Sequence, residues 1–383
     1  MDHDMDRRSV LCTISQKLQR RNSLTPNPFL GVLLHWTGGL AAASFYIPYK
    51  QVRRWSWETY WLAGGFFSWI IMPALMASLL VPGVWSILAH TPITVLFWAF
   101  LFGMLWGVGG LTFGLTMRYL GIALGMAVAL GYTAVFGTMI PPIFHGQLSG
   151  IFSTLSGKFI LLGVFASVIG IGVSGMAGMS KERELTTEQK QSTITEFHFG
   201  KGMAIATFSG IMSSCMAFGL DAGKPINDYA VKILQLHGRS GIWQGLPVLI
   251  PVLLGGFVTN FVWCAALNIK NRSGREYLGV VKGQKEGASL IANNYLFSAM
   301  AGITWYLQFF FYTMGQSKMG SYSFSSWTLH MASIMIFSML WGIALKEWKG
   351  TSKRTHWLIG LGLLVLVSST VIIGYGNYLN IPK

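Results

Sequence analysis

Long apolar runs separated by short polar segments dominate the chain. Ten runs are long enough to cross a hydrocarbon core of ~30 Å, which takes about 20 residues at a helical rise of ~1.5 Å. Only Thr112 to Tyr119 lies between the third run and the fourth. The pattern therefore predicts an all-α integral membrane protein whose ten transmembrane helices lie at 29–49, 59–80, 92–112, 118–140, 158–179, 200–220, 246–268, 288–313, 325–345 and 356–378.

The polar segments divide the chain into two halves. Residues 1–28 mix acidic and basic side chains, unlike a cleavable signal peptide, so we expect a disordered tail. The longest interior polar segment indicates a cytoplasmic linker at 180–199 between five-helix halves at 29–179 and 200–383. Because each half has an odd number of helices, the two halves enter the membrane in opposite directions. This is the inverted repeat of many secondary transporters.

Composition supports the membrane class and bears on orientation. The 383 residues are 52% hydrophobic and 11% charged, against about 25% charged in soluble domains. The net charge of +15 does not indicate nucleic-acid binding, because Lys and Arg lie between the apolar runs. Most of them fall in the odd-numbered loops, which predicts that these loops are cytoplasmic and that both termini face outward across the cell inner membrane.

The basic residues of the N-terminal tail argue for the opposite orientation, but the tail also carries three aspartates. Three cysteines at distant positions, Cys12, Cys215 and Cys264, have no metal or redox spacing. We therefore expect no metal site, no cofactor and no disulfide framework.

Ionisable side chains within apolar runs are costly and usually face a cavity or one another. His35 and His330 lie at similar depths in helices that enter from the same side, and histidine titrates near neutral pH. Each is a candidate proton site or a neutral histidine bonded to a neighbouring helix. Glu58, at the cytoplasmic start of the second helix, either carries a proton or pairs with Arg53 or Arg118. Arg118, expected in the turn after the third helix, is a candidate structural or gating residue.

A polar and aromatic group in the eighth helix is the candidate sugar site. Trp305, Tyr306 and Gln308 lie within about one turn, and Asn294 shares their helix. Aromatic faces can pack on the C–H surface of a sugar ring, while hydroxyl and amide groups bond its hydroxyls. The alternatives are an interfacial aromatic belt and, for Asn294, a helix-to-helix hydrogen bond.

Five short strings give the chain a resemblance to the L-rhamnose/proton symporter family, within the drug/metabolite transporter superfamily. They occur in order across both halves, at Trp55–Thr59, Gly114–Gly121, Trp305–Tyr312, Ser326–His330 and Leu345–Trp348. The resemblance covers most of residues 29–378 and implies ten helices in an inverted repeat. It also implies uptake of L-rhamnose with protons by alternating access, with L-rhamnose, protons and the lipid bilayer as partners.

Other functions remain open at the level of the sequence. A related transporter of another sugar or metabolite differs only in the shape of its pocket, and a membrane sugar sensor binds without transport. A membrane enzyme requires a clustered acid, base or metal set at the surface, and the sequence contains no such cluster. The sequence therefore favours a secondary transporter over an enzyme and predicts no nucleic-acid partner.

Overall fold

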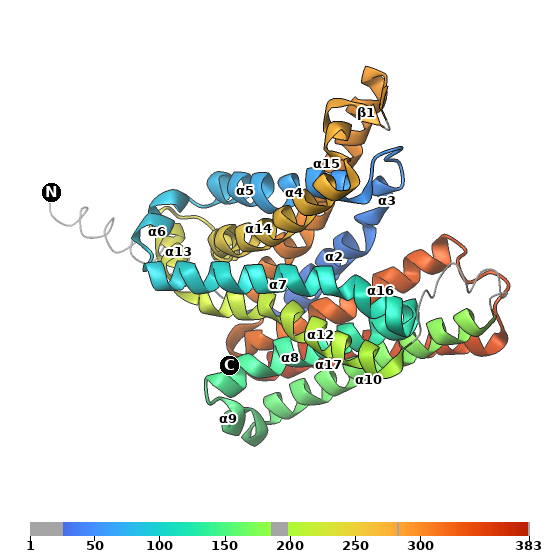
Figure 1. Ribbon diagram of the computed structural model, residues 1–383. Helices are drawn as coiled ribbons and strands as arrows, with labels where there is room; N and C mark the ends of the chain where they lie inside the picture. The colour runs from blue at the N-terminus through green and yellow to red at the C-terminus, as the bar shows by residue number, and fades with distance from the viewer. Residues whose placement is uncertain (1–25, 185–197, 282, 382–383) are drawn as a thin grey trace, which may run out of the picture.

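The computed structural model describes residues 26–184, 198–281 and 283–381, and these residues form an almost entirely helical bundle (Figure 1). Most of the expected tail at 1–28 and of the expected linker at 180–199 lies outside the described residues. One short antiparallel pair of strands, β1 (Val280–Val281) and β2 (Gln284–Lys285), interrupts the helices of the described part.

The helices follow the chain in two sets. The first set comprises α2 (Pro28–Ser44), α3 (Tyr46–Tyr49), α4 (Trp57–Phe66), the π-helical turn η1 (Phe67–Ile71), α5 (Met72–Leu80), α6 (Val84–His90), α7 (Ile93–Leu120), α8 (Ile122–Phe144), α9 (Leu148–Ser153) and α10 (Leu155–Glu184). The second comprises α12 (Phe199–Ala222), α13 (Lys224–Leu236), η2 (Gly241–Trp243), α14 (Leu246–Asn271), η3 (Gly274–Leu278), α15 (Ala288–Gln316), η4 (Gly320–Ser325), α16 (Ser326–Ala344) and α17 (Lys353–Leu379).

The expected all-α membrane fold is confirmed. Nine helical segments among the described residues are long and apolar enough to span a bilayer. The remaining long helix, α15, has 29 residues and is less apolar, because it carries Asn293, Asn294 and Gln308. It matches the predicted eighth helix.

The expected break between the third and fourth helices is misplaced. Helix α7 continues through Thr112–Tyr119, and the chain turns at Gly121, whose φ of 82° is easily adopted only by glycine. Arg118 therefore lies in the last turn of α7 rather than in a loop.

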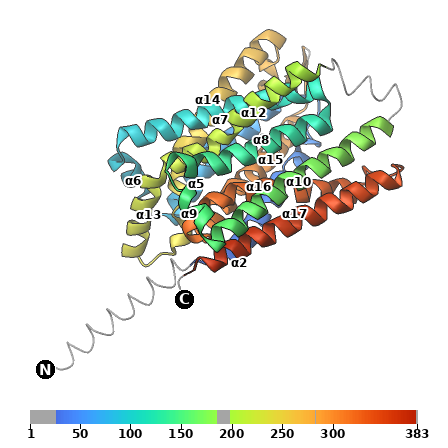
Figure 2. The same cartoon turned by 90° about the horizontal axis from the view of Figure 1, so that it is seen from below.

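Equivalent helices of the two halves pack in equivalent ways. Helix α2 packs against α15 and α16, just as α12 packs against α7 and α8. Helix α4 packs against α15, just as α14 packs against α7. The last helices of the two halves, α10 and α17, lie side by side (Figure 2). Exchanging the halves maps each of the other pairs onto its counterpart and the α10–α17 pair onto itself, which is the pattern expected of an inverted repeat.

Glycines allow the closest of these helix crossings. A Cβ at Gly302 of α15 would collide with the backbone oxygen of Gly64 in α4. A Cβ at Gly255 of α14 would collide with the backbone oxygen of Phe100 in α7. Small residues at such crossings let membrane helices approach closely enough for extensive van der Waals contact.

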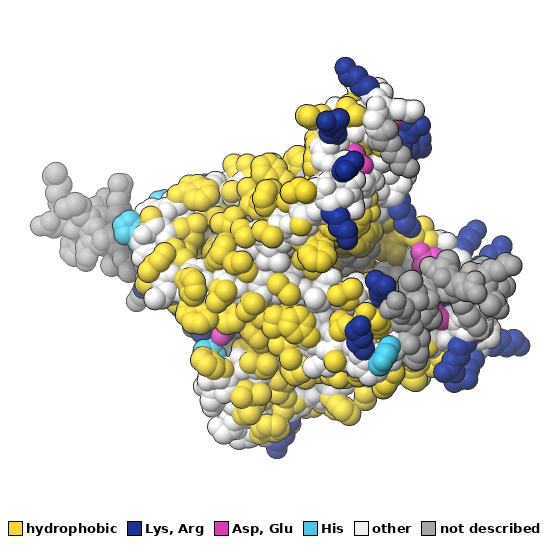
Figure 3. Space-filling model, viewed as in Figure 1, with side chains coloured by type: hydrophobic (Ala, Val, Ile, Leu, Met, Phe, Trp, Pro, Cys, Tyr) yellow, Lys and Arg dark blue, Asp and Glu magenta, His cyan; other side chains and the backbone are white. Residues whose placement is uncertain are grey.

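The two ends of the bundle differ in charge. Lys and Arg side chains gather at the end that carries α3, η3 and β1, and an apolar band lies behind them (Figure 3). We call this the basic end; its residues include Lys50, Arg54, Arg272 and Lys349. The opposite end carries α6, α9 and α13 (Figure 1). There the imidazole of His145, directly after α8, meets the carboxylate of Asp221 in α12 at 2.7 Å.

Candidate functional site

Two buried histidines form the first part of the site. His35 of α2 and His330 of α16 are both 0% exposed. The Tyr312 ring of α15 lies between them, with its centroid 5.2 Å from that of His35 and 5.3 Å from that of His330. The structure thus brings the two predicted histidines to one tyrosine. We call His35 and His330 the histidine pair.

The ring nitrogens of both histidines lack partners. Neither Nδ1 nor Nε2 of His35 or His330 has a hydrogen-bond partner among the described residues. Leaving a buried polar group unpaired costs about 1–3 kcal/mol. The four ring nitrogens of the histidine pair are therefore candidate positions for a proton or a hydrogen-bonding ligand.

An aromatic cluster, comprising Trp69, Trp106, Trp305 and Phe309, forms the second part. Trp305 lies at its centre, with ring centroids 5.4 Å from Trp69, 5.5 Å from Trp106 and 5.2 Å from Phe309. These side chains come from η1, α7 and α15. The cluster joins both halves of the chain at one place inside the bundle.

The cluster and the histidine pair are continuous. Phe309 lies 5.9 Å from His330 between ring centroids. Trp305, Phe309 and Tyr312 are spaced by four and three residues, and this spacing places them on one face of α15. Helix α15 therefore presents a strip of aromatic rings that leads from Trp69 to the two histidines.

A cavity of about 10 Å³ lies beside this strip. Its lining residues are Phe45, Tyr49, Trp61, Gly65, Ser68, Trp69, Gly302 and Trp305. A cavity of that size holds about one water molecule. The cavity is therefore too small for a ligand larger than a water molecule.

The remaining candidates of the eighth helix have different positions. Tyr306 is fully buried, its hydroxyl has no partner in the described part of the chain, and its ring lies 6.1 Å from that of Phe310. Gln308 is buried one turn from Trp305 and Tyr312. Both supply hydrogen-bonding groups close to the aromatic strip.

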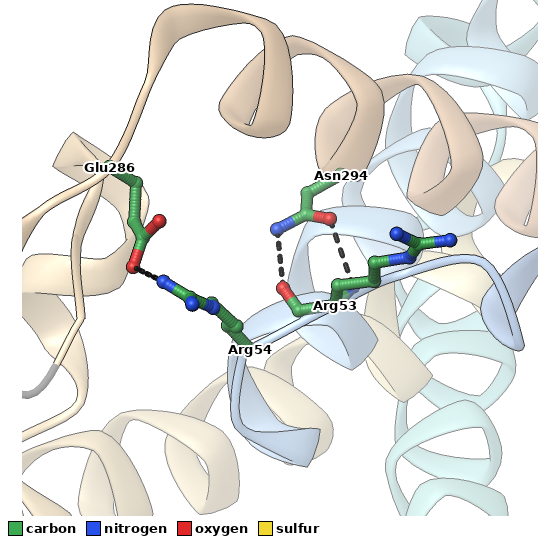
Figure 4. A network of polar contacts seen from close by, with 4 residues as sticks. All are labelled: Arg53, Arg54, Glu286 and Asn294. Carbon is green, nitrogen blue, oxygen red and sulfur yellow. Dashed lines mark hydrogen bonds and ion pairs between the residues drawn. The ribbon is translucent and has the colours of Figure 1, made fainter.

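Asn294 is not brought to the aromatic cluster. Its amide oxygen accepts from the Arg53 backbone N–H at 3.0 Å, and its amide nitrogen donates to the Arg53 carbonyl at 2.9 Å (Figure 4). Nearby, Arg54 pairs with Glu286 at 2.6 Å, and the Glu276 carboxylate accepts from the N–H and hydroxyl of Ser56. We call these contacts the basic-end clamp, because they tie the α3–α4 linker to the α14–α15 connection and to the first turns of α15.

Glu58 is held by uncharged side chains. It is 4% exposed, and one carboxylate oxygen accepts from Asn271 at 2.9 Å and from the Ser273 hydroxyl at 2.7 Å. The expected alternative, a pair with Arg53 or Arg118, is therefore replaced by two hydrogen bonds from the end of α14 and the segment after it. Asn271 and Ser273 also line an open groove of about 720 Å³ at the basic end.

Trp69, Trp106 and Tyr312 were missed by the sequence reasoning. The chain has 15 tryptophans, and a tryptophan in a membrane protein usually belongs to an interfacial belt. Residue type alone therefore does not single out Trp69 and Trp106. Pro73 shortly after Trp69 was the available signal, because a proline removes a helical hydrogen bond and disturbs the turn before it.

Comparison with known proteins places the chain in context. Residues 25–378 match the family described as L-rhamnose-proton symport protein. A Yersinia pestis (strain Pestoides F) protein named L-rhamnose-proton symporter is 38% identical over 350 residues, which is 91% of this chain and 97% of the relative. A protein of the same name from Yersinia pestis bv. Antiqua (strain Antiqua) is 37% identical over 350 residues, again 91% of this chain and 97% of the relative.

Proposed function

Because the chain belongs to the L-rhamnose-proton symport family, we propose that it carries L-rhamnose inward together with protons by alternating access. The observation that carries this proposal is the match over residues 25–378, which includes both halves and every part of the candidate site. The buried polar groups without partners, next to a strip of aromatic rings, supply the chemistry that such transport needs.

Protons act at the histidine pair in this mechanism. Histidine changes charge near neutral pH, and His35 and His330 face the same tyrosine. Protonation of one ring from outside creates a donor and a positive charge within the bundle. A sugar hydroxyl then accepts from that donor, so sugar binding and proton binding favour each other.

The sugar binds along α15. Trp305 offers a face to the C–H surface of the ring, while the Tyr306 hydroxyl and the Gln308 amide bond its hydroxyls. Asn294 acts in the basic-end clamp instead, since both atoms of its amide are bonded to Arg53. Arg118, in the last turn of α7, anchors the basic end of that helix.

Glu58 is the inward release site. Its carboxylate is buried, and its two partners line the open groove at the basic end. A proton that reaches Glu58 therefore leaves to water in the groove that Asn271 and Ser273 line. We place the basic end in the cytoplasm, because Lys and Arg in short loops stay on that side of the inner membrane.

The driving force is sufficient for uptake. One proton moving through a potential of ~100 mV releases about 2.3 kcal/mol. At about 1.4 kcal/mol per tenfold concentration ratio, this supports roughly 50-fold accumulation of the sugar.

External pH tests the proposal directly. L-rhamnose is added to lightly buffered, de-energised cells that express the chain, with L-fucose as the comparison sugar. A rise of external pH with L-rhamnose alone is expected. No rise with either sugar, with the protein present in the membrane, contradicts the proposal and favours another substrate or a sensor without transport.

A further inference from the structure

We propose that Trp69 is a sugar-binding residue whose indole N–H donates to one hydroxyl of the sugar, opposite Trp305. This inference rests on the proposed function and adds a binding group from the first half of the chain. The sugar is then held between η1 and α15, by both halves at once.

The indole N–H of Trp69 is buried and unpaired. Trp69 is 3% exposed, and its Nε1 has no hydrogen-bond partner in the part of the chain that the structure describes. By contrast, Trp61 donates to the Asn260 amide oxygen at 3.1 Å, and Trp327 donates to the Thr133 carbonyl at 2.9 Å. Buried tryptophans usually find such an acceptor, so Trp69 has a donor available for a ligand.

The indole N–H of Trp69 is suited to binding the sugar and not to carrying the proton. An indole nitrogen donates one hydrogen bond and accepts none. It cannot take up a proton at physiological pH, but it can donate to a hydroxyl oxygen. The surrounding rings of Trp61 and Trp305 offer apolar faces to the C–H groups of a sugar ring, with centroids 6.0 and 5.4 Å from that of Trp69.

A π-helical turn carries Trp69. The N–H of Met72 donates to the carbonyl of Phe67, five residues earlier, where an α-helix has a spacing of four. Pro73 follows directly and has no N–H, so the regular bonding of the helix is interrupted here. Single π turns inside membrane helices occur frequently at functional sites.

A glycine leaves space for the Trp69 ring. A Cβ at Gly65, one turn earlier, would lie 2.5 Å from Cζ3 of Trp69. The ring therefore occupies the space beside residue 65 that a side chain there would fill. In this position it borders the 10 Å³ cavity together with Ser68, Gly302 and Trp305.

The test uses purified protein in proteoliposomes and counterflow of L-rhamnose. Trp69→Phe keeps a six-membered aromatic ring but removes the N–H together with the five-membered part of the indole, so the analogue pattern is needed to assign the effect to the N–H. We expect its half-saturation constant to rise about tenfold. Trp348→Phe is the matched control, because the Trp348 N–H is also buried and unpaired but lies between α16 and α17. Its constant should equal that of the parent.

Analogues of L-rhamnose that each lack one hydroxyl make the test specific. In the parent, loss of the hydroxyl that meets Trp69 weakens binding. In Trp69→Phe, that one analogue should compete as well as L-rhamnose does, while the other analogues keep their penalties. An unchanged constant, or an unchanged pattern of analogue penalties, overturns the inference.

Gly65→Ala provides a second variant in case Trp69→Phe does not reach the membrane. The added methyl group displaces the Trp69 ring and should reproduce the raised constant and the same analogue pattern. Gly172→Ala, where the new methyl group meets nothing within 4 Å, is its control. Absence of L-rhamnose counterflow in the parent contradicts the proposed function itself, whereas an active parent with normal variants contradicts only the role of Trp69.

Discussion

Buried polar atoms without partners gather on a few helices that meet inside the bundle. They include the His35 and His330 rings, the Trp69 indole, and the Ser298 and Tyr306 hydroxyls. Each would cost about 1–3 kcal/mol if it stayed unpaired. Most of the buried atoms without partners in the described part of the chain lie on α2, η1, α15 and α16, and in the proposed mechanism this region exchanges water for substrate.

His330 is the sharper test of proton coupling, because it contacts Tyr312 and also Phe309, a member of the aromatic cluster. His330→Asn keeps hydrogen-bonding capacity but cannot take up a proton. We expect counterflow of L-rhamnose within about threefold of the parent, since exchange needs no net proton movement, but no accumulation driven by a pH gradient. Proteoliposomes preloaded with L-rhamnose measure the counterflow, and proteoliposomes with an imposed pH gradient measure the accumulation.

His356→Asn is the control for this variant, because His356 is exposed and its Nδ1 contacts the Ser352 carbonyl near the start of α17. It should accumulate sugar normally. Normal accumulation by His330→Asn as well would show that another group takes up the coupled proton.

Glu58 distinguishes a proton carrier from a structural acceptor. In Glu58→Gln the side-chain oxygen still accepts from Asn271 and Ser273, so the amount of folded protein should stay the same. Gradient-driven uptake should nevertheless fall at least tenfold, because an amide releases no proton. Glu58→Ala should also lower stability, since the hydrogen bonds from the exposed Asn271 and the buried Ser273 are lost at about 0.5–1.5 kcal/mol each. Full gradient-driven uptake by Glu58→Gln would assign Glu58 a purely structural role.

Residue type made some site residues predictable and concealed others. His35 and His330 are conspicuous because an imidazole is rare within an apolar run. Asn294 was expected near the sugar, but its partner is a backbone 241 residues away in sequence, and no local pattern specifies such a pairing. Trp69 became a candidate only when its N–H was found unpaired.

At the scale of elements, the length of apolar runs predicted all ten long helices. Lengths alone did not locate the end of α7, because Thr112–Tyr119 reads equally well as a polar break or as helix. The turn depends on Gly121 and its positive φ. The π turn in the second helix was likewise not predictable. The run around it is apolar on all sides, so one additional residue in a turn leaves no visible change in the pattern.

Close helix crossings predict a stability effect outside the site. Gly255→Ala places a methyl group against the Phe100 carbonyl and forces α14 away from α7. We expect a loss of about 1–3 kcal/mol in the free energy of unfolding, measured in mixed micelles. Gly172→Ala should not destabilise the protein, because its methyl group faces open space. Equal stability of the two variants would mean that the α7–α14 crossing tolerates separation.

At the scale of the whole molecule, the halves are related by packing but differ in how their connections are held. At the basic end, polar side chains of the clamp tie the α3–α4 linker to the α14–α15 connection. At the opposite end, α6 and α13 pack through buried apolar residues such as Ile87 and Ile226. The difference arises from side chains that only the fold brings together.

The orientation proposed from the distribution of Lys and Arg can be tested by labelling. In a Cys12→Ser background the two remaining cysteines are buried. Leu236→Cys in α13 is placed where the side chain is 73% exposed, and Lys349→Cys lies at the basic end. An impermeant maleimide should label Leu236→Cys in intact cells and Lys349→Cys only after permeabilisation. The positive-inside rule predicts this pattern, because short loops rich in Lys and Arg stay on the cytoplasmic side of the membrane. The reverse pattern would place the Glu58 groove outside, and Glu58 could then not release protons to the cytoplasm.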